Sequence, residues 1–170
     1  TIVTTDTQMD LGAVTLTDTT ELDTGTAATS IMNVGAVTSG GNALTLDSGG
    51  NAAADITVTS FTGGGDLTVR DSGGTSFTGG VNAGTVTLTA TNGVVSFGGN
   101  LTVGTALITA AQPYGLSITG ATNSIAGDTT FANTGALVIG DAAGDTTTFA
   151  GGLDTTVGPG PVSLAGTILT

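Results

Sequence analysis

The chain repeats one pattern along its length, most clearly between Asp66 and Gly99. Each copy opens with an apolar-Thr-apolar triplet, which begins at Leu67 in the first copy and at Val86 in the second. Each copy ends in Ser-Phe followed by a glycine pair, and its phenylalanine is Phe77 in the first copy and Phe97 in the second. Strand-like segments that recur with a period of about 20 residues are typical of a solenoid.

The pattern inside each repeat indicates a three-sided coil of strands. Residues two apart point to the same face of a strand, so the apolar members of each triplet face inward and the intervening Thr faces outward. Glycine-rich turns then separate three short strands per repeat, and no helical spacing of apolar residues persists. We therefore predict an all-β fold, a parallel β-helix (β-solenoid) with three-sided coils of about 19–23 residues. About eight such coils would form a rod roughly 40 Å long.

The repeats differ in regularity along the chain. Residues 1–43 are expected to form less regular N-terminal β coils, and residues 44–170 to form the β-solenoid repeats, as one continuous domain that is a segment of a longer chain. The expected core consists of Leu67, Val69, Phe77, Val86, Leu88, Phe97, Leu137 and Phe149. The expected turn glycines are Gly79, Gly80, Gly98, Gly99, Gly151 and Gly152. If the segment from Phe97 to Phe131 spans two coils, then Phe77, Phe97, Phe131 and Phe149 form one internal aromatic column.

Charge and composition exclude several classes of function. Thirteen acidic residues against a single Arg give a net charge of −12, which opposes binding to nucleic acid or to an anionic membrane surface. No uninterrupted apolar run of about 18–20 residues is present, so we expect no membrane insertion. The chain has no His, Cys or Lys, which rules out the usual nucleophilic triads.

The residues that are present leave two kinds of site to consider, a catalytic site and a calcium site. A polysaccharide lyase would have only Arg70 as its base, and a hydrolase would rely on a carboxylate pair such as Asp141 and Asp145. Both aspartates lie in a glycine-spaced turn, where Asp is ordinary, so we expect no enzyme. Calcium is the one cofactor that the segments 63–67 and 140–145 suggest, but their spacing departs from calcium-binding repeats, so we expect no cofactor and no metal site.

The repeated sequence pattern consists of a triplet, a glycine, Ser-Phe and a glycine pair, and it is clearest over residues 44–164. This pattern resembles the repeats of filamentous-haemagglutinin-like and autotransporter-like bacterial β-helix repeat proteins. That resemblance implies a right-handed β-helix, an extracellular or cell-surface location in bacteria, and work as a stalk or adhesin. It transfers no functional residue.

Three functional hypotheses follow. In the first, the chain is a structural segment of an extracellular bacterial fibre, stalk or adhesin. In the second, it is a carbohydrate-binding adhesin module that recognises host or environmental glycans through the loop at Gln112 and Pro113, with Tyr114 stacking on a sugar. In the third, it is a self-assembling filament subunit whose partners are neighbouring coils or subunits of the same protein, either through stacked coil ends or as a β-sandwich completed by a donated strand.

Overall fold

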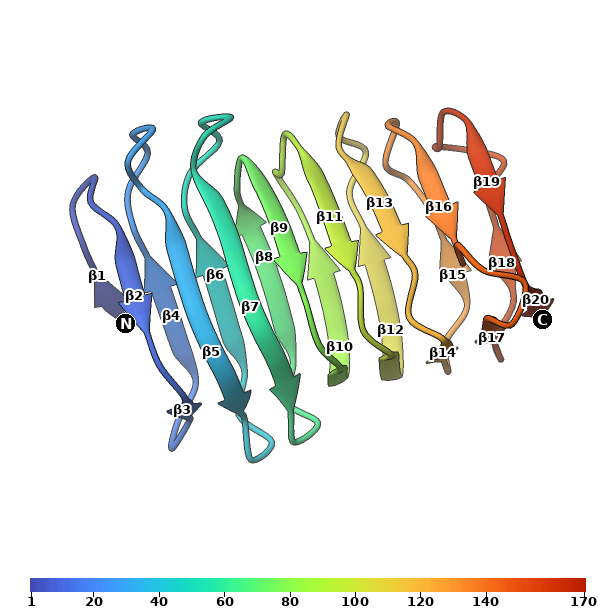
Figure 1. Cartoon of the computed structure of the whole chain (residues 1–170), viewed down its shortest axis with the longest axis horizontal. Helices are drawn as coiled ribbons and strands as arrows, with labels where there is room; N and C mark the ends of the chain where they lie inside the picture. The colour runs from blue at the N-terminus through green and yellow to red at the C-terminus, as the bar shows by residue number, and fades with distance from the viewer.

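The computed structural model describes all 170 residues, which form one rod of coils stacked along the long axis (Figure 1). The chain forms twenty β-strands and no helix, so no helix could cross a membrane. The coils have about 22 residues each and number about eight. The all-β parallel solenoid predicted from the repeat period is therefore confirmed.

Each coil has three faces, and each strand pairs in parallel with its counterpart in the next coil. Face A consists of β1 (Ile2–Val3), β4 (Thr20–Asp23), β6 (Leu44–Asp47), β8 (Leu67–Asp71), the second halves of β10 (Val81–Leu88) and β12 (Leu101–Thr109), β15 (Thr129–Thr130) and β18 (Leu153–Asp154). Face B consists of β2 (Met9–Leu11), the first halves of β5 (Met32–Thr38) and β7 (Asp55–Thr62), β9 (Gly74–Phe77), β11 (Val94–Phe97), β13 (Gly115–Ile118), β16 (Leu137–Ile139) and β19 (Val162–Leu164). Face C consists of β3 (Val14–Thr15), the second halves of β5 and β7, the first halves of β10 and β12, β14 (Thr122–Ile125), β17 (Thr146–Phe149) and β20 (Thr167–Leu169).

The interior is built from columns of apolar side chains that repeat from coil to coil. On face A, Leu44 pairs with Leu67, Leu67 with Val86, and Val86 with Leu107, and all four are buried. The other core residues expected from the sequence, listed above, are likewise fully buried. Because each coil covers the apolar inner face of the next, stability accrues through stacking.

The aromatic residues do not form one column, contrary to the expectation from their spacing. Phe77 and Phe97 stack on face B, and the partners of Phe97 in the following coils are Ile118 and then Ile139. Phe149 instead lies on face C beside Ile125, where it meets Phe131 edge to face. Phe131 precedes Ile139 in the chain, so the segment from Phe97 to Phe131 is shorter than two whole coils, and the aromatic position moves to a different face.

The glycine pairs also occupy two different corners. Gly79–Gly80 and Gly98–Gly99 join face B to face C, after β9 and β11. Gly151–Gly152 follows β17 and joins face C to face A. The similar local sequences therefore mark different turns of the coil, because Phe149 ends a strand of another face.

Candidate functional site

A row of outward side chains runs along face B. Asp10, at the N-terminal end, pairs in register with Asn33 and then with Thr57, and the row continues through Ser76, Ser96 and Ser117. Neighbouring parallel strands lie about 4.8 Å apart, so this row is a regular line of small polar groups along the rod.

The molecule has one hollow on its surface, and it lies beside this row. It has a volume of about 340 Å³. It is lined by Asp55, Ile56, Thr57, Gly73, Gly74, Thr75, Ser76, Val94 and Ser96. These residues come from β7, β9, β11 and the corner that precedes β9. We refer to it as the face B groove.

The absence of a side chain at Gly74 creates the groove. Gly74 pairs with Asp55 in the preceding coil, and Val94 lies above it in the following coil. A Cβ added at Gly74 would lie 3.1 Å from Oδ1 of Asp55. Asp55 and Val94 therefore form two walls, both exposed to solvent, and the backbone at Gly74 forms the floor.

Four polar side chains at the groove are not committed to other parts of the protein, those of Asp55, Thr57, Ser76 and Ser96, whereas the hydroxyl of Thr75 shares a hydrogen bond with that of Ser72. Most aspartates are occupied locally: Asp23 accepts from the backbone N–H of Gly25, and Asp47 accepts from that of Gly49. In contrast, the carboxylate of Asp55 has no hydrogen bond or ion pair within the chain. The hydroxyls of Thr57, Ser76 and Ser96, in the row beside it, have no partner within the chain either. The groove therefore presents hydrogen-bonding groups that a ligand can satisfy.

The single cation of the chain is committed elsewhere. Arg70, on β8, bridges two preceding coils by pairing with Glu21 of β4 and, at 2.5 Å from its Nε, with Asp47 of β6. The hydrogen bond that Arg70 donates to Asp47 is the main cause that raises the pKa of Arg70. Arg70 directly follows the apolar-Thr-apolar triplet of β8 on face A and does not line the groove.

Asp71, the residue after Arg70, has fewer hydrogen-bond partners than the paired carboxylates of Glu21 and Asp47. Its Oδ1 atom is buried and has no hydrogen-bond partner. Burial, followed by repulsion from the Asp47 carboxylate, raises the pKa of Asp71.

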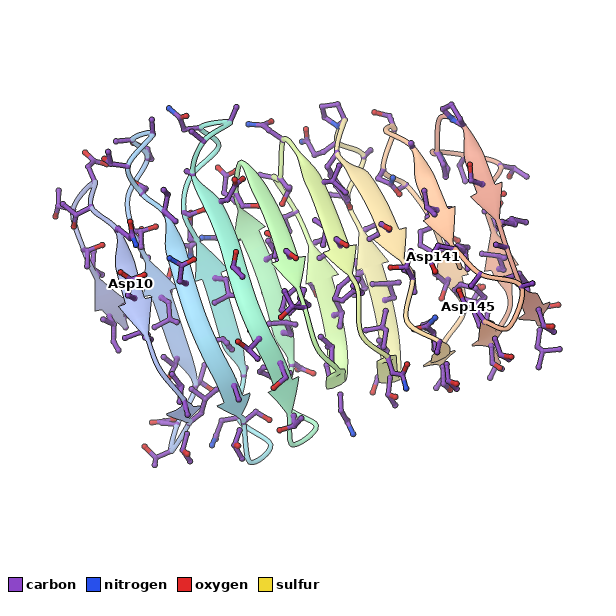
Figure 2. All side chains as sticks on the ribbon, in the orientation of Figure 1. Asp10, Asp141 and Asp145 are labelled. Carbon is purple, nitrogen blue, oxygen red and sulfur yellow. The ribbon has the colours of Figure 1, made fainter.

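The two aspartates considered for hydrolysis, Asp141 and Asp145, form a turn. Oδ2 of Asp145 accepts hydrogen bonds of 2.9 Å from the backbone N–H groups of Asp141 and Ala142, which lower the pKa of Asp145. Figure 2 shows this pair near the C-terminal end of the rod, far from Asp10 at the other end. At Asp10, hydrogen bonds from Asn33 and then Gln8 lower the pKa. The acidic residues are thus spread along the rod, and no three of them gather to hold a metal ion.

The loop that sequence spacing suggested as a sugar site is arranged differently. Gln112 is exposed, and its backbone carbonyl accepts a hydrogen bond from the N–H of Thr134. Tyr114, however, is fully buried, because it occupies an inward position just before β13. Its ring is packed in the core and presents no face to a ligand, which removes the stacking platform that this hypothesis needed.

Two features of the chain escaped the sequence analysis. An Asp-Thr/Ser-Gly motif recurs once per coil in three successive coils, beginning at Asp23, Asp47 and Asp71, and marks the corner between faces A and B. Its middle hydroxyls are buried; for example, Thr24 and Ser48 donate to the backbone carbonyls of Ser30 and Ala54. The second feature is the face B groove itself, whose only signal in the sequence is the pair Gly73–Gly74 at the start of a strand.

Comparison of the chain with protein-family models, curated proteins and solved structures finds no match.

Proposed function

We propose that this chain is a structural, non-catalytic β-solenoid segment of an extracellular bacterial fibre, stalk or adhesin. The observation that supports the proposal is the continuous parallel stack from β1 to β20, in which each coil closes the core of the one before it. Such an arrangement gives a stiff rod whose length grows with the number of coils. The resemblance of its repeats to those of filamentous-haemagglutinin-like and autotransporter-like proteins supports the location.

The surface of the rod supports the same function. Its outward positions carry mainly Thr, Ser, Asn and Asp, and the net charge of −12 keeps copies of the rod apart along their sides. Rigidity, resistance to proteases and presentation of attached segments are properties that a fibre or stalk requires. None of them depends on a catalytic group.

Two measurements test this function. Small-angle X-ray scattering should give an elongated particle with a coil stack about 40 Å long, as about eight coils spaced at about 4.8 Å require. Antibodies against the chain should label intact cells of the source bacterium as strongly as permeabilised cells. Labelling that requires permeabilisation would contradict the extracellular assignment and leave the rod shape intact.

A second function, end-to-end assembly into a filament, is favoured by the two ends of the rod. Ile2 and Val3 are 50% and 59% exposed at one end, and Leu164 and Leu169 are 58% and 48% exposed at the other. Leu164 continues the column that runs through Ile139, so it occupies an inward position that a further coil would cover, whether that coil belongs to the same chain or to a second copy. We propose that these ends stack on the coils of a second copy, whose strand edges and apolar columns match them.

Sedimentation velocity tests this assembly. The chain should form longer particles as its concentration rises, and Leu164→Lys should keep it monomeric. Ile108→Lys provides the matched control, because Ile108 is similarly exposed (49%) but lies in β12, in the middle of the rod. A chain that stays monomeric at high concentration, or that is equally affected by both variants, would rule out stacking of the ends.

A further inference from the structure

The face B groove carries an inference that does not depend on the rod being part of a fibre. It combines a carboxylate without a partner, three hydroxyls without partners and an exposed apolar side chain around a floor that lacks a side chain. We propose that the groove binds an uncharged saccharide.

The polar groups define what the ligand must offer. The ionised carboxylate of Asp55 only accepts hydrogen bonds, so its partner must be a donor. The hydroxyls of Thr57, Ser76 and Ser96 donate and accept, and they lie in register in three successive coils. A ligand that lies along the rod meets one of these hydroxyls about every 4.8 Å. Groups that both donate and accept at short intervals are the hydroxyls of a sugar.

Charge narrows the class of ligand further. The groove contains no cationic side chain, and the only Arg of the protein is paired with Glu21 and Asp47 on face A. An acidic sugar, a phosphate or a sulfate would therefore meet Asp55 with no compensating positive charge. An uncharged saccharide avoids this repulsion and still offers the donors that the carboxylate requires.

The apolar part of the groove fits the same ligand. Val94 is 54% exposed at the groove wall, where its side chain can contact the C–H groups of a sugar ring. The Gly74 floor lets a ring approach the backbone more closely than any other residue would allow. The volume of about 340 Å³ is at the lower end of the range for small-ligand sites. A shallow site of this size predicts weak, millimolar binding.

A titration of the isotope-labelled full chain followed by NMR tests the proposal. Cellobiose, maltose and lactose serve as neutral probes, glucuronate as an anionic probe and spermidine as a cationic probe, each added up to tens of millimolar. At least one neutral disaccharide should shift the backbone amides of Thr57, Gly74 and Ser96 in a saturable manner, whereas glucuronate should not. If no neutral probe shifts these amides, or if spermidine alone does, the groove is not a saccharide site.

Variants locate the binding and test the assigned groups. Asp55→Ala should weaken binding about tenfold or more, because it removes a charged acceptor. Gly74→Ala should also weaken binding, because its Cβ takes space from the floor and crowds the Asp55 carboxylate. Ser117→Ala is the matched control, since Ser117 continues the same row one coil beyond the groove and should bind as the natural chain does. Circular dichroism confirms that each variant is folded, and unchanged binding by the folded Asp55→Ala variant would overturn the proposal.

Discussion

The rings of Phe77 and Phe97 lie in adjacent coils with their centroids 5.0 Å apart and their planes within 6° of parallel. Both rings are fully buried in the face B column, between Val58 on one side and Ile118 on the other. The spacing of the coils therefore sets the spacing of the rings, and a stacked pair at this distance adds to the stability gained from burial alone.

Phe97→Ala should destabilise the chain by about 3–5 kcal/mol, the usual range for this change in a core. The substitution removes buried apolar surface and leaves a cavity that the strand spacing of the stack prevents from collapsing. Urea or guanidinium unfolding, followed by circular dichroism, measures the loss. Phe97→Leu is the matched control and should cost less than about 1.5 kcal/mol, because it keeps most of the volume. Equal losses in the two variants would show that the cavity does not determine the cost.

The parallel solenoid could be predicted because its strands repeat locally. The triplets at Leu67 and Val86 carry their own alternation of inward and outward residues, and their spacing equals the length of the coil between them. The face to which an aromatic residue belongs could not be predicted in the same way. The corners differ in length from coil to coil. Phe131 and Phe149 are therefore spaced about one repeat apart in the sequence, but they do not lie on face B with Phe77 and Phe97.

The candidate site was much harder to predict than the fold. Asp55, Gly74 and Val94 belong to three successive coils, and they form a groove only once the register of β7, β9 and β11 is known. Apart from the pair Gly73–Gly74, no local motif marks them. At Tyr114 the sequence instead suggested a site that the structure does not have. A tyrosine beside a proline in a turn suggested an exposed ring, whereas the side chain fills an inward position.

Gly93→Ala should destabilise the chain by about 1–3 kcal/mol, the usual range for overpacking. A Cβ at Gly93 would overlap the backbone oxygen of Gly73 in the preceding coil, which forces the two coils apart. Thermal or denaturant unfolding measures the effect.

Gly104→Ala is the matched control for this prediction. A Cβ at Gly104 would lie 3.8 Å from the nearest atom, the backbone oxygen of Ala83, at an ordinary contact distance. This variant should be neutral or stabilising by up to about 1 kcal/mol, because Ala restricts the unfolded chain. A destabilisation equal to that of Gly93→Ala would contradict the steric explanation.

Asp71→Asn should stabilise the chain at neutral pH. Burial and the neighbouring Asp47 carboxylate raise the pKa of Asp71, so ionisation of Asp71 costs the folded state more than the unfolded state. The gain should appear as the pH rises through the pKa of an unfolded aspartate, about 3.9, and should be absent at lower pH, where both states are protonated. Unfolding midpoints of both proteins across this range measure it. The contrasting control is Asp66→Asn, because Oδ1 of Asp66 accepts a 2.8 Å hydrogen bond from the N–H of Thr85, and this variant should gain nothing.

Tyr114 should make the fold sensitive to alkaline pH. Burial raises the pKa of its phenol to about 12, compared with about 10 in an unfolded chain, so the folded state favours the neutral ring. The neutral buried ring therefore contributes fully to the free energy of unfolding below pH 10. As the pH rises through about 12 this contribution is lost, and the free energy of unfolding falls by about 3 kcal/mol, which corresponds to a difference of about two in pKa. The chain has no Lys and no other Tyr, so little else titrates in this range, and tyrosinate absorbance reports on this ring alone. Tyr114→Phe should not show the decrease and should fold equally well, because the phenol oxygen has no hydrogen-bond partner. A native phenol that titrates near pH 10 would show that the ring reaches solvent.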